Sequence, residues 1–171
     1  MVLFHFAPVD SPLLPAFVTR ALRSGEDQRI LAALELVLTQ QRLFPAPAPM
    51  RLARAANPEI RIKFFKALPF LQLAGEVPLV LQAGLEDPDW RVRAMAARAC
   101  AHFRPAALTD RLLEMCRRFE HPSEAAHAAR ALATMGGEGW LRLQDIANSA
   151  DASARHIATE AVERHILGGA A

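Results

Sequence analysis

Apolar side chains recur along this chain at the spacing of one face of an α-helix. A clear run is Leu108, Leu112, Met115, Cys116 and Phe119, which the helical period places on a single side. Amphipathic stretches of this kind span residues 13–22, 49–56, 77–86, 107–120 and 139–150. β-Branched residues are sparse in the chain, and alanine, leucine and arginine dominate it. The pattern therefore predicts an all-α protein.

A polar capping signal and a second helical pattern follow each amphipathic stretch. The signals lie at residues 24–29, 57–61, 87–93, 121–125 and 150–155. In three of them a proline comes directly after the polar residue, where its missing N–H suits the first turn of a helix. We therefore predict helical hairpins, each made of a helix A followed by a helix B.

Similar residues return along helix B at a nearly constant interval. The pair Ala99 and Cys100 has counterparts at spacings of 32, 32, 32 and 30 residues. These counterparts are Glu35 and Leu36, Ala67 and Leu68, Ala131 and Leu132, and Ala161 and Val162. Six positions before the pairs stand Arg29, Arg61, Arg93, Ala125 and Arg155. A fixed period with a recurrent arginine indicates stacked repeats rather than a single closed core.

The repeated residues resemble HEAT repeats, especially the short variety found in bacterial and bilin-lyase-type proteins. The signature is Asp-Pro, then Val-Arg, then small residues, then Ala-Leu. Residues 87–100, DPDWRVRAMAARAC, are the best copy, and NPEIRIKFFKAL at 57–68 and HPSEAAHAARAL at 121–132 are weaker copies. The resemblance covers roughly residues 13–167.

The resemblance implies a right-handed α-solenoid, an α-α superhelix of about five HEAT-like hairpins in one domain over residues 1–171. We expect an apolar N-terminal segment or cap at 1–12, followed by repeats at approximately 13–43, 44–74, 75–104, 105–136 and 137–167. The signature residues Asp87 and Arg93 would then be structural and would link neighbouring repeats. Ala125 departs from the arginine pattern, which predicts an irregular junction around residues 119–128.

Composition narrows the function without naming it. The formal net charge is only +2, so the whole molecule produces no strong field for nucleic acid or for an anionic membrane. Cys100 and Cys116 lie within apolar helical patterns, as expected for reduced packing residues in a cytoplasmic protein. No segment reaches the roughly 18 apolar residues of a membrane helix, and we expect no membrane insertion in this chain. The pattern leaves open whether the chain is part of a larger protein.

Candidate chemistry is sparse. The six histidines contain no pair at i, i+4 with a suitable carboxylate, so we expect no metal site. The His-Glu dipeptides of the iron-dependent deoxyhypusine hydroxylases in the HEAT class are absent. The chain also shows no tetrapyrrole constellation of the bilin-lyase kind. We therefore predict no catalytic residue and no cofactor.

Five residues are candidates for binding a partner. Lys66, Arg98 and Arg130 occupy the same position in successive repeats and form a stripe along helix B, either as a solvated face or as a contact for phosphate or an acidic protein. Trp90 and Arg91 open one helix B, where an exposed tryptophan beside arginine is typical of an interface. Packing of Trp90 against the preceding helix is the alternative.

These observations favour a non-catalytic protein-protein interaction scaffold or adaptor that uses its helix B surface, with a protein partner of unknown identity. A nucleic-acid-binding protein that uses the local basic stripe is a second possibility, and it is not favoured. A lyase-like or glycosylase-like enzyme comes third. HEAT-like DNA glycosylases combine basic, aromatic and acidic groups on a concave surface, and here only the basic and aromatic candidates stand out.

Overall fold

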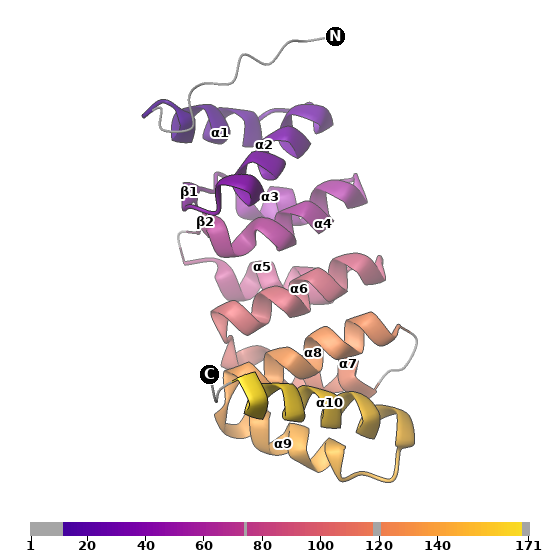
Figure 1. The fold of residues 1–171 in the computed structure, drawn as a ribbon. Coiled ribbons are helices and arrows are strands. Elements are labelled where there is room, and N and C mark those ends of the chain that lie inside the picture. Colours follow the sequence, from indigo (N-terminus) through magenta and orange to yellow (C-terminus); the bar gives the residue numbers. More distant parts are fainter. Residues whose placement is uncertain (1–11, 74, 118–120, 169–171) are drawn as a thin grey trace. The chain divides into compact units, whose positions relative to one another are not determined.

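A computed structural model describes residues 12–73, 75–117 and 121–168 of the chain. The backbone divides into two compact units, unit 1 at Met1–Gly75 and unit 2 at Glu76–Ala171. Most of the expected N-terminal segment, 1–12, lies outside the described residues. Each unit is built from antiparallel helical hairpins, so the predicted all-α class is confirmed (Figure 1).

Unit 1 contains two hairpins, α1–α2 and α3–α4. Its helices are α1 Leu14–Leu22, α2 Asp27–Gln40, α3 Pro49–Ala53 and α4 Pro58–Ala67, followed by the 3-10 turn η1 Leu68–Phe70. The helices α2 and α4 pack against each other and form the helix B layer of this unit. Phe64, Phe65 and Leu34 fill its core and are 0–1% exposed.

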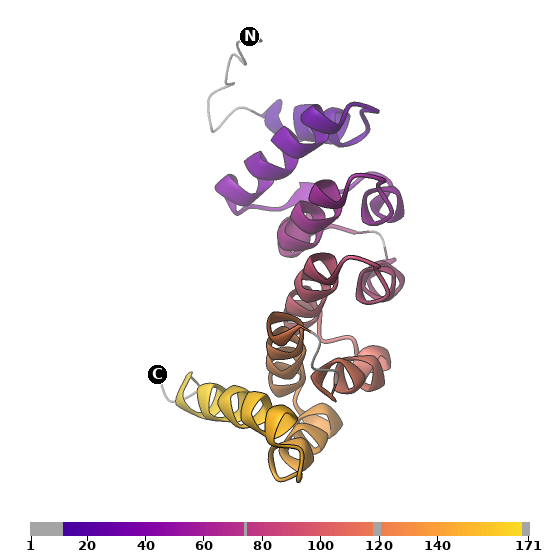
Figure 2. The ribbon, with the colours of Figure 1, turned by 90° about the vertical axis from the view of Figure 1, so that its right-hand side faces the viewer.

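Unit 2 contains three hairpins, α5–α6, α7–α8 and α9–α10. Its elements are α5 Val77–Leu85, α6 Trp90–Phe103, the 3-10 turn η2 Ala106–Leu108, α7 Thr109–Arg117, α8 Pro122–Met135, α9 Gly137–Ala147 and α10 Ala152–Gly168. Figure 2 shows α6, α8 and α10 on one side of this unit and α5, α7 and α9 on the other. The predicted order of helix A and helix B is therefore observed. The exact repeat boundaries and the hand of the superhelix stay predictions.

Small residues allow the helix B layer of unit 2 to pack closely. Ala96 and Ala97 of α6 and Ala128 and Ala129 of α8 are all 0% exposed. Alanine leaves the two backbones free to approach, because no long side chain stands between them. Cys100 and Cys116 are buried and free, which confirms their predicted role as packing residues.

Polar caps begin three of the helices, although not always at the predicted residue. Asn57 accepts a hydrogen bond from the Glu59 N–H at 3.0 Å, and Asp151 accepts from Ser153 at 3.0 Å. At the best HEAT copy the cap is Asp89 rather than the Asp before the proline, because Asp87 instead accepts from the Asp89 N–H at 2.9 Å. The side-chain caps expected at 24–29 and 121–125 are not observed at the N-cap residues. These residues, Glu26 and His121, make no capping hydrogen bond with their side chains.

The proline-rich connection at 44–49 contains a short strand that the pattern did not predict. Phe44–Pro45 forms β1, and Leu71–Gln72 forms β2, which pairs with it in parallel. Phe44 is 0% exposed, so burial of its ring holds the connection against the unit and brings the two exits from helix B together. Residue 45 is a proline and offers no N–H, which keeps the ladder short.

The repeat register of the first hairpin is one residue away from the prediction. In α2 the buried residues are Ala33, Leu34 and Val37, whereas Ala32 and Glu35 are exposed. The buried pair Ala33 and Leu34 therefore matches Phe64 and Phe65 of α4 at a spacing of 31 rather than 32 residues. The position that corresponds to Lys66 in this hairpin is therefore Glu35, whereas the predicted spacing of 32 residues gives Leu34.

The recurrent arginine has a defined structural task. Arg93 donates from Nη1 to the carbonyl oxygens of Asp87 and Pro88, and Arg61 and Arg155 make the equivalent bonds to the carbonyls six residues earlier. Arg93 also donates from Nε and Nη2 to both oxygens of Glu124 in the next repeat, at 2.8 and 2.9 Å. The predicted link between repeats is confirmed for Arg93. Arg29 is an exception, because it pairs with the nearby Glu26.

The irregular junction expected around 119–128 is only partly visible. Residues 118–120 lie outside the described part of the chain, and α8 is regular from Pro122 onward. Although position 125 carries alanine, the repeat is still tied to its neighbour, since Glu124 accepts from Arg93. Arg93 of the preceding helix B thus supplies a link to this repeat, although position 125 has no arginine.

Candidate functional site

Arg98 and Arg130 are exposed on neighbouring helices of unit 2. Arg98 lies on α6 and Arg130 lies on α8, and these two helices pack against each other along their length. Within the described residues, neither guanidinium takes part in an ion pair or a side-chain hydrogen bond. Three other helix B arginines of this unit, Arg91, Arg93 and Arg164, each pair with a carboxylate, and Arg155 donates to the Ser149 carbonyl oxygen. Two positive charges therefore remain available on this face.

His127 lies one turn before Arg130 on α8 and shares its surroundings. Its side chain is half-buried. Burial lowers the pKa of His127, and the positive charges of Arg130 and Arg98 lower the pKa further. His127 therefore lies in the positive field of the two arginines.

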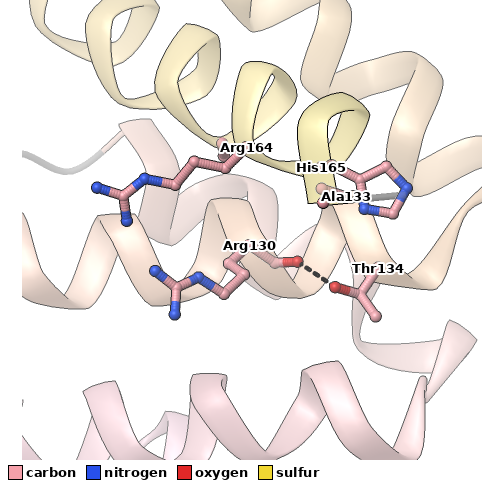
Figure 3. A pocket seen from close by; sticks show the side chains of 7 residues that line it. Arg130, Ala133, Thr134, Arg164 and His165 are labelled. Carbon is pink, nitrogen blue, oxygen red and sulfur yellow. Dashed lines mark hydrogen bonds between the residues drawn. The ribbon is translucent and has the colours of Figure 1, made fainter. Parts of the chain in front are cut away.

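A hollow of about 360 Å³ lies between α8 and α10 beside Arg130. Its lining comes from Arg130, Ala133 and Thr134 of α8 and from Ala161, Arg164, His165 and Gly168 of α10. In Figure 3 the side chains of Arg130 and Arg164 extend in the same direction, and Thr134 and His165 lie at the opposite end. Thr134 donates its hydroxyl hydrogen to the Arg130 carbonyl oxygen at 2.8 Å. The hollow therefore combines a small apolar floor with two guanidinium groups.

Arg164 and His127 were not among the sequence candidates. Arg164 stands four residues after Glu160, and its Nη2 donates to Glu160 Oε1 at 2.5 Å. In α10 the position that corresponds to Arg130 carries Glu160, so a search for an arginine at the same repeat position does not find Arg164. The usable signal is an arginine one helical turn further along α10, which occupies the same side of the helix.

Lys66 lies in unit 1, in a different environment from the two arginines. Its neighbour Glu35 has a lowered pKa, chiefly because Lys63 donates a hydrogen bond to it, and the charge of Lys66 lowers the pKa further. Lys63 and Glu35 thus form an ion pair on this helix B layer, close enough to Lys66 for its charge to act on Glu35. In unit 2 the predicted stripe residues Arg98 and Arg130 lie on the adjacent helices α6 and α8.

Trp90 and Arg91 lie at the N-terminal end of α6. The Trp90 ring stacks on His121, with centroids 4.9 Å apart and planes inclined by 16°, and 38% of the residue stays exposed. Trp90 is thus partly exposed, as one of the two interpretations of the sequence expected, and its ring stacks on a residue of the following repeat. Arg91 donates to both oxygens of Asp89 at 3.2 and 2.8 Å. Because Arg98 lies about 10 Å further along the helix, Trp90 and Arg91 do not belong to the same cluster as Arg98 and Arg130.

Other chemistry finds little support in the described part of the chain. No group of three or more histidine, cysteine or acidic residues is arranged there to hold a metal ion. Burial raises the pKa of Cys100 and of Cys116 to about 12, so neither thiol is readily ionised to act as a nucleophile. No described helix combines the length and apolar character needed to cross a membrane.

Comparison with known proteins agrees with the repeat architecture. The family model described as HEAT repeats matches residues 77–163, which is about half of the chain and lies entirely within unit 2. A search among curated proteins returned no match. HEAT repeats commonly mediate protein interactions, and the family is generally a non-enzymatic scaffold. With its hairpins, its Asp-Pro copy and its linking arginine, the chain belongs to the HEAT-repeat family.

Proposed function

We propose that this protein is a non-catalytic scaffold that binds a protein partner through the helix B surface of unit 2. The observation that carries the proposal is the pair of exposed arginines, Arg98 and Arg130, which lie on adjacent helices and have no carboxylate partner in the part of the chain that the structure describes. An arginine that is not paired within its own chain has its fork of donors available for a partner's carboxylate. The proposal assigns no catalytic residue and no cofactor to the chain.

The partner surface is expected to be acidic. Arg98 and Arg130 give this face a local positive potential, which also lowers the pKa of His127, and complementary charge accelerates encounter and selects among partners. Trp90, Arg91 and Lys66 stay predicted contacts outside this cluster. The two buried free cysteines suit a reducing compartment, so we place the protein in the cytoplasm.

Nucleic-acid binding is the competing function for the same arginines. A nucleic acid is usually bound by a run of cations along its backbone, with affinity that falls steeply with salt. The sequence stripe offered three such residues, but Lys66 lies beside Glu35, which would repel phosphate. The carboxylate of Glu35 close to Lys66 favours a protein partner over a nucleic acid.

Quantitative affinity capture tests the proposal. The immobilised 171-residue chain would be compared with Arg98→Glu/Arg130→Glu and with a control of equal charge change, Arg20→Glu/Arg117→Glu, whose arginines are exposed on α1 and α7. We expect at least one protein to be captured by the wild type and by the control. The amount of this protein captured by Arg98→Glu/Arg130→Glu should be lower by about tenfold or more. That protein would then be purified and its Kd measured against all three forms.

Two results would refute the proposal. Equal capture of the same proteins by all three forms would show that the arginine pair is not the binding surface. A mobility shift with DNA or RNA at low salt, lost in Arg98→Glu/Arg130→Glu, would support the nucleic-acid alternative instead. Unchanged circular dichroism spectra of the variants would establish that the loss does not come from unfolding.

A further inference from the structure

The hollow between α8 and α10 has the shape and chemistry of a small anion site. Ala133 and Ala161 provide an apolar floor, and Arg130 and Arg164 stand along one side (Figure 3). His165 at the other end contacts the ring of Trp140, with centroids 5.2 Å apart, so this wall is supported from α9. The two guanidinium groups come from different helices, and a group bound between them would contact both helices at once.

The two arginines differ in what they already bind. Arg130 has no carboxylate partner among the described residues. Arg164 binds Glu160 on its own helix, with side chains that are 62% and 45% exposed. An exposed pair at i, i+4 contributes only about 0.3–0.5 kcal/mol, because water screens it and two long side chains must be held in place. Glu160 is therefore a ligand that another carboxylate can replace at small cost.

We infer that this hollow binds a carboxylate side chain from an acidic segment of the protein partner, held between Arg130 and Arg164 in place of Glu160. The inference rests on the proposed function and adds the chemical group that the partner presents. Arg164 is the new binding residue, and Glu160 regulates access to it as an internal competitor. The bidentate geometry of guanidinium and carboxylate supplies the specificity of the contact.

Charge and size favour a carboxylate over a nucleic-acid phosphate chain. The row of guanidinium groups is short, and the acidic side chain of Glu160 borders it on α10. A nucleic acid that lies along the helices would hold a fixed row of phosphates against this carboxylate and be repelled, whereas a flexible acidic peptide can avoid it. A single carboxylate on a peptide can enter between the two arginines and leave the neighbouring acidic groups in water.

Fluorescence anisotropy with a labelled hexaglutamate peptide tests the inference on the full chain, with hexaglutamine as the uncharged control probe. We expect hexaglutamate to bind and hexaglutamine not to bind. Arg164→Gln and Arg130→Gln should each weaken hexaglutamate binding by about tenfold, as for loss of a charge-assisted bidentate contact. Glu160→Gln should tighten it by about twofold, because the internal competitor is gone.

Arg117→Gln is the matched control, because it removes an exposed arginine of the same unit from the opposite layer. Its affinity should stay within about twofold of the wild type. The inference is overturned if hexaglutamate does not bind, if Arg164→Gln equals Arg117→Gln, or if Glu160→Gln weakens binding. A labelled oligothymidylate that binds more tightly than hexaglutamate and depends on Arg164 would also overturn it, in favour of a phosphate site.

The two proposals fail separately. Arg164 and Glu160 play no part in the capture experiment with Arg98→Glu/Arg130→Glu. Loss of partner capture in that variant, with unchanged capture by Arg164→Gln, would keep the scaffold and reject the hollow as its contact. Binding of hexaglutamate at Arg164 without any captured protein that depends on Arg98 and Arg130 would support the hollow and reject the scaffold surface.

Discussion

The helix B layers of both units contain ion pairs, but they differ at the basic stripe. In unit 1, Lys63 binds Glu35, Lys66 adds to the positive potential at that carboxylate, and Asn57 donates to Asp27 at 2.9 Å. In unit 2, Arg98 and Arg130 have no such partners among the described residues. The same hairpin scheme therefore supports a surface with an ion pair between neighbouring helices and another with two exposed arginines that are not paired with described carboxylates. This difference is the reason why we propose unit 2 as the binding unit.

The cores of the two units differ in the size of the side chains that fill the helix B layer. Unit 1 fills its helix B layer with Phe64 and Phe65, whose rings pack edge to face with their centroids 5.2 Å apart. Unit 2 places alanines such as Ala97 and Ala128 at the equivalent positions. Large rings stabilise by burying area, whereas small residues stabilise by bringing helices together. A close helix spacing also brings side chains on adjacent helices nearer to each other, as with Arg98 and Arg130.

The largest expected effect is in the aromatic core of unit 1. Phe64→Ala should lower the free energy of unfolding of this unit by about 3–5 kcal/mol, because Phe64 is 0% exposed and its removal leaves a cavity. Amide hydrogen exchange along α4 would measure the loss. Leu43→Ala is the control, since that side chain is 59% exposed and should cost little. Equal protection of α4 in both variants would contradict the account of the core.

A smaller effect is expected where charges link the repeats. Arg93→Ala should destabilise unit 2 by about 2–4 kcal/mol, because it leaves Glu124 unpaired at 12% side-chain exposure and frees two backbone carbonyls. Lys63→Ala in unit 1 should cost less than about 1 kcal/mol, since that pair is 33% and 59% exposed. Chemical denaturation followed by circular dichroism would compare the two. A larger loss of unfolding free energy in Lys63→Ala than in Arg93→Ala would contradict the view that Arg93 is the stronger link between repeats.

The smallest expected effect concerns pH. Because the folded protein lowers the pKa of His127, the unfolded chain takes up this proton first as the pH falls below the ordinary value of about 6.5. This side chain therefore adds no pH dependence well above 6.5, and stability declines as the pH falls from there toward the folded pKa. In His127→Gln this part of the decline should be absent.

Thermal unfolding between pH 7.5 and pH 5 would measure the slope. His156→Gln is the control, because that histidine is exposed on α10 and should leave the slope as in the wild type. A wild-type slope in His127→Gln would show that another group accounts for the decline.

Much of the helix pattern was predictable because it depends on local rules. The stretch at 139–150 corresponds to α9 at Gly137–Ala147, and the stretch at 77–86 corresponds to α5 at Val77–Leu85. Apolar periodicity, proline and capping residues act within a few positions of themselves. The cap at Asp89 rather than Asp87 shows the limit, since two aspartates close to one proline compete and only the backbone geometry selects between them.

The candidate site was harder to predict, because contacts between helices create it. Repeat spacing correctly placed Arg98 and Arg130 on neighbouring helices. It aligned the first hairpin one residue out of register, and so concealed that Glu35 stands at the stripe position and faces Lys63. A shift of one residue turns a helix by about 100° and exchanges a buried side chain for an exposed one.

The sequence by itself determined the all-α class, the alternation of helix A and helix B, and the structural task of Arg93. These follow from periodicity and from a recurrent residue, which need no knowledge of distant neighbours. Only the tertiary structure decided that the charge of Lys66 acts on Glu35, that Trp90 stacks on His121, and that Arg164 joins Arg130 at one hollow. Whether a surface charge is satisfied or open depends on side chains that meet across helices, and helix packing sets those meetings.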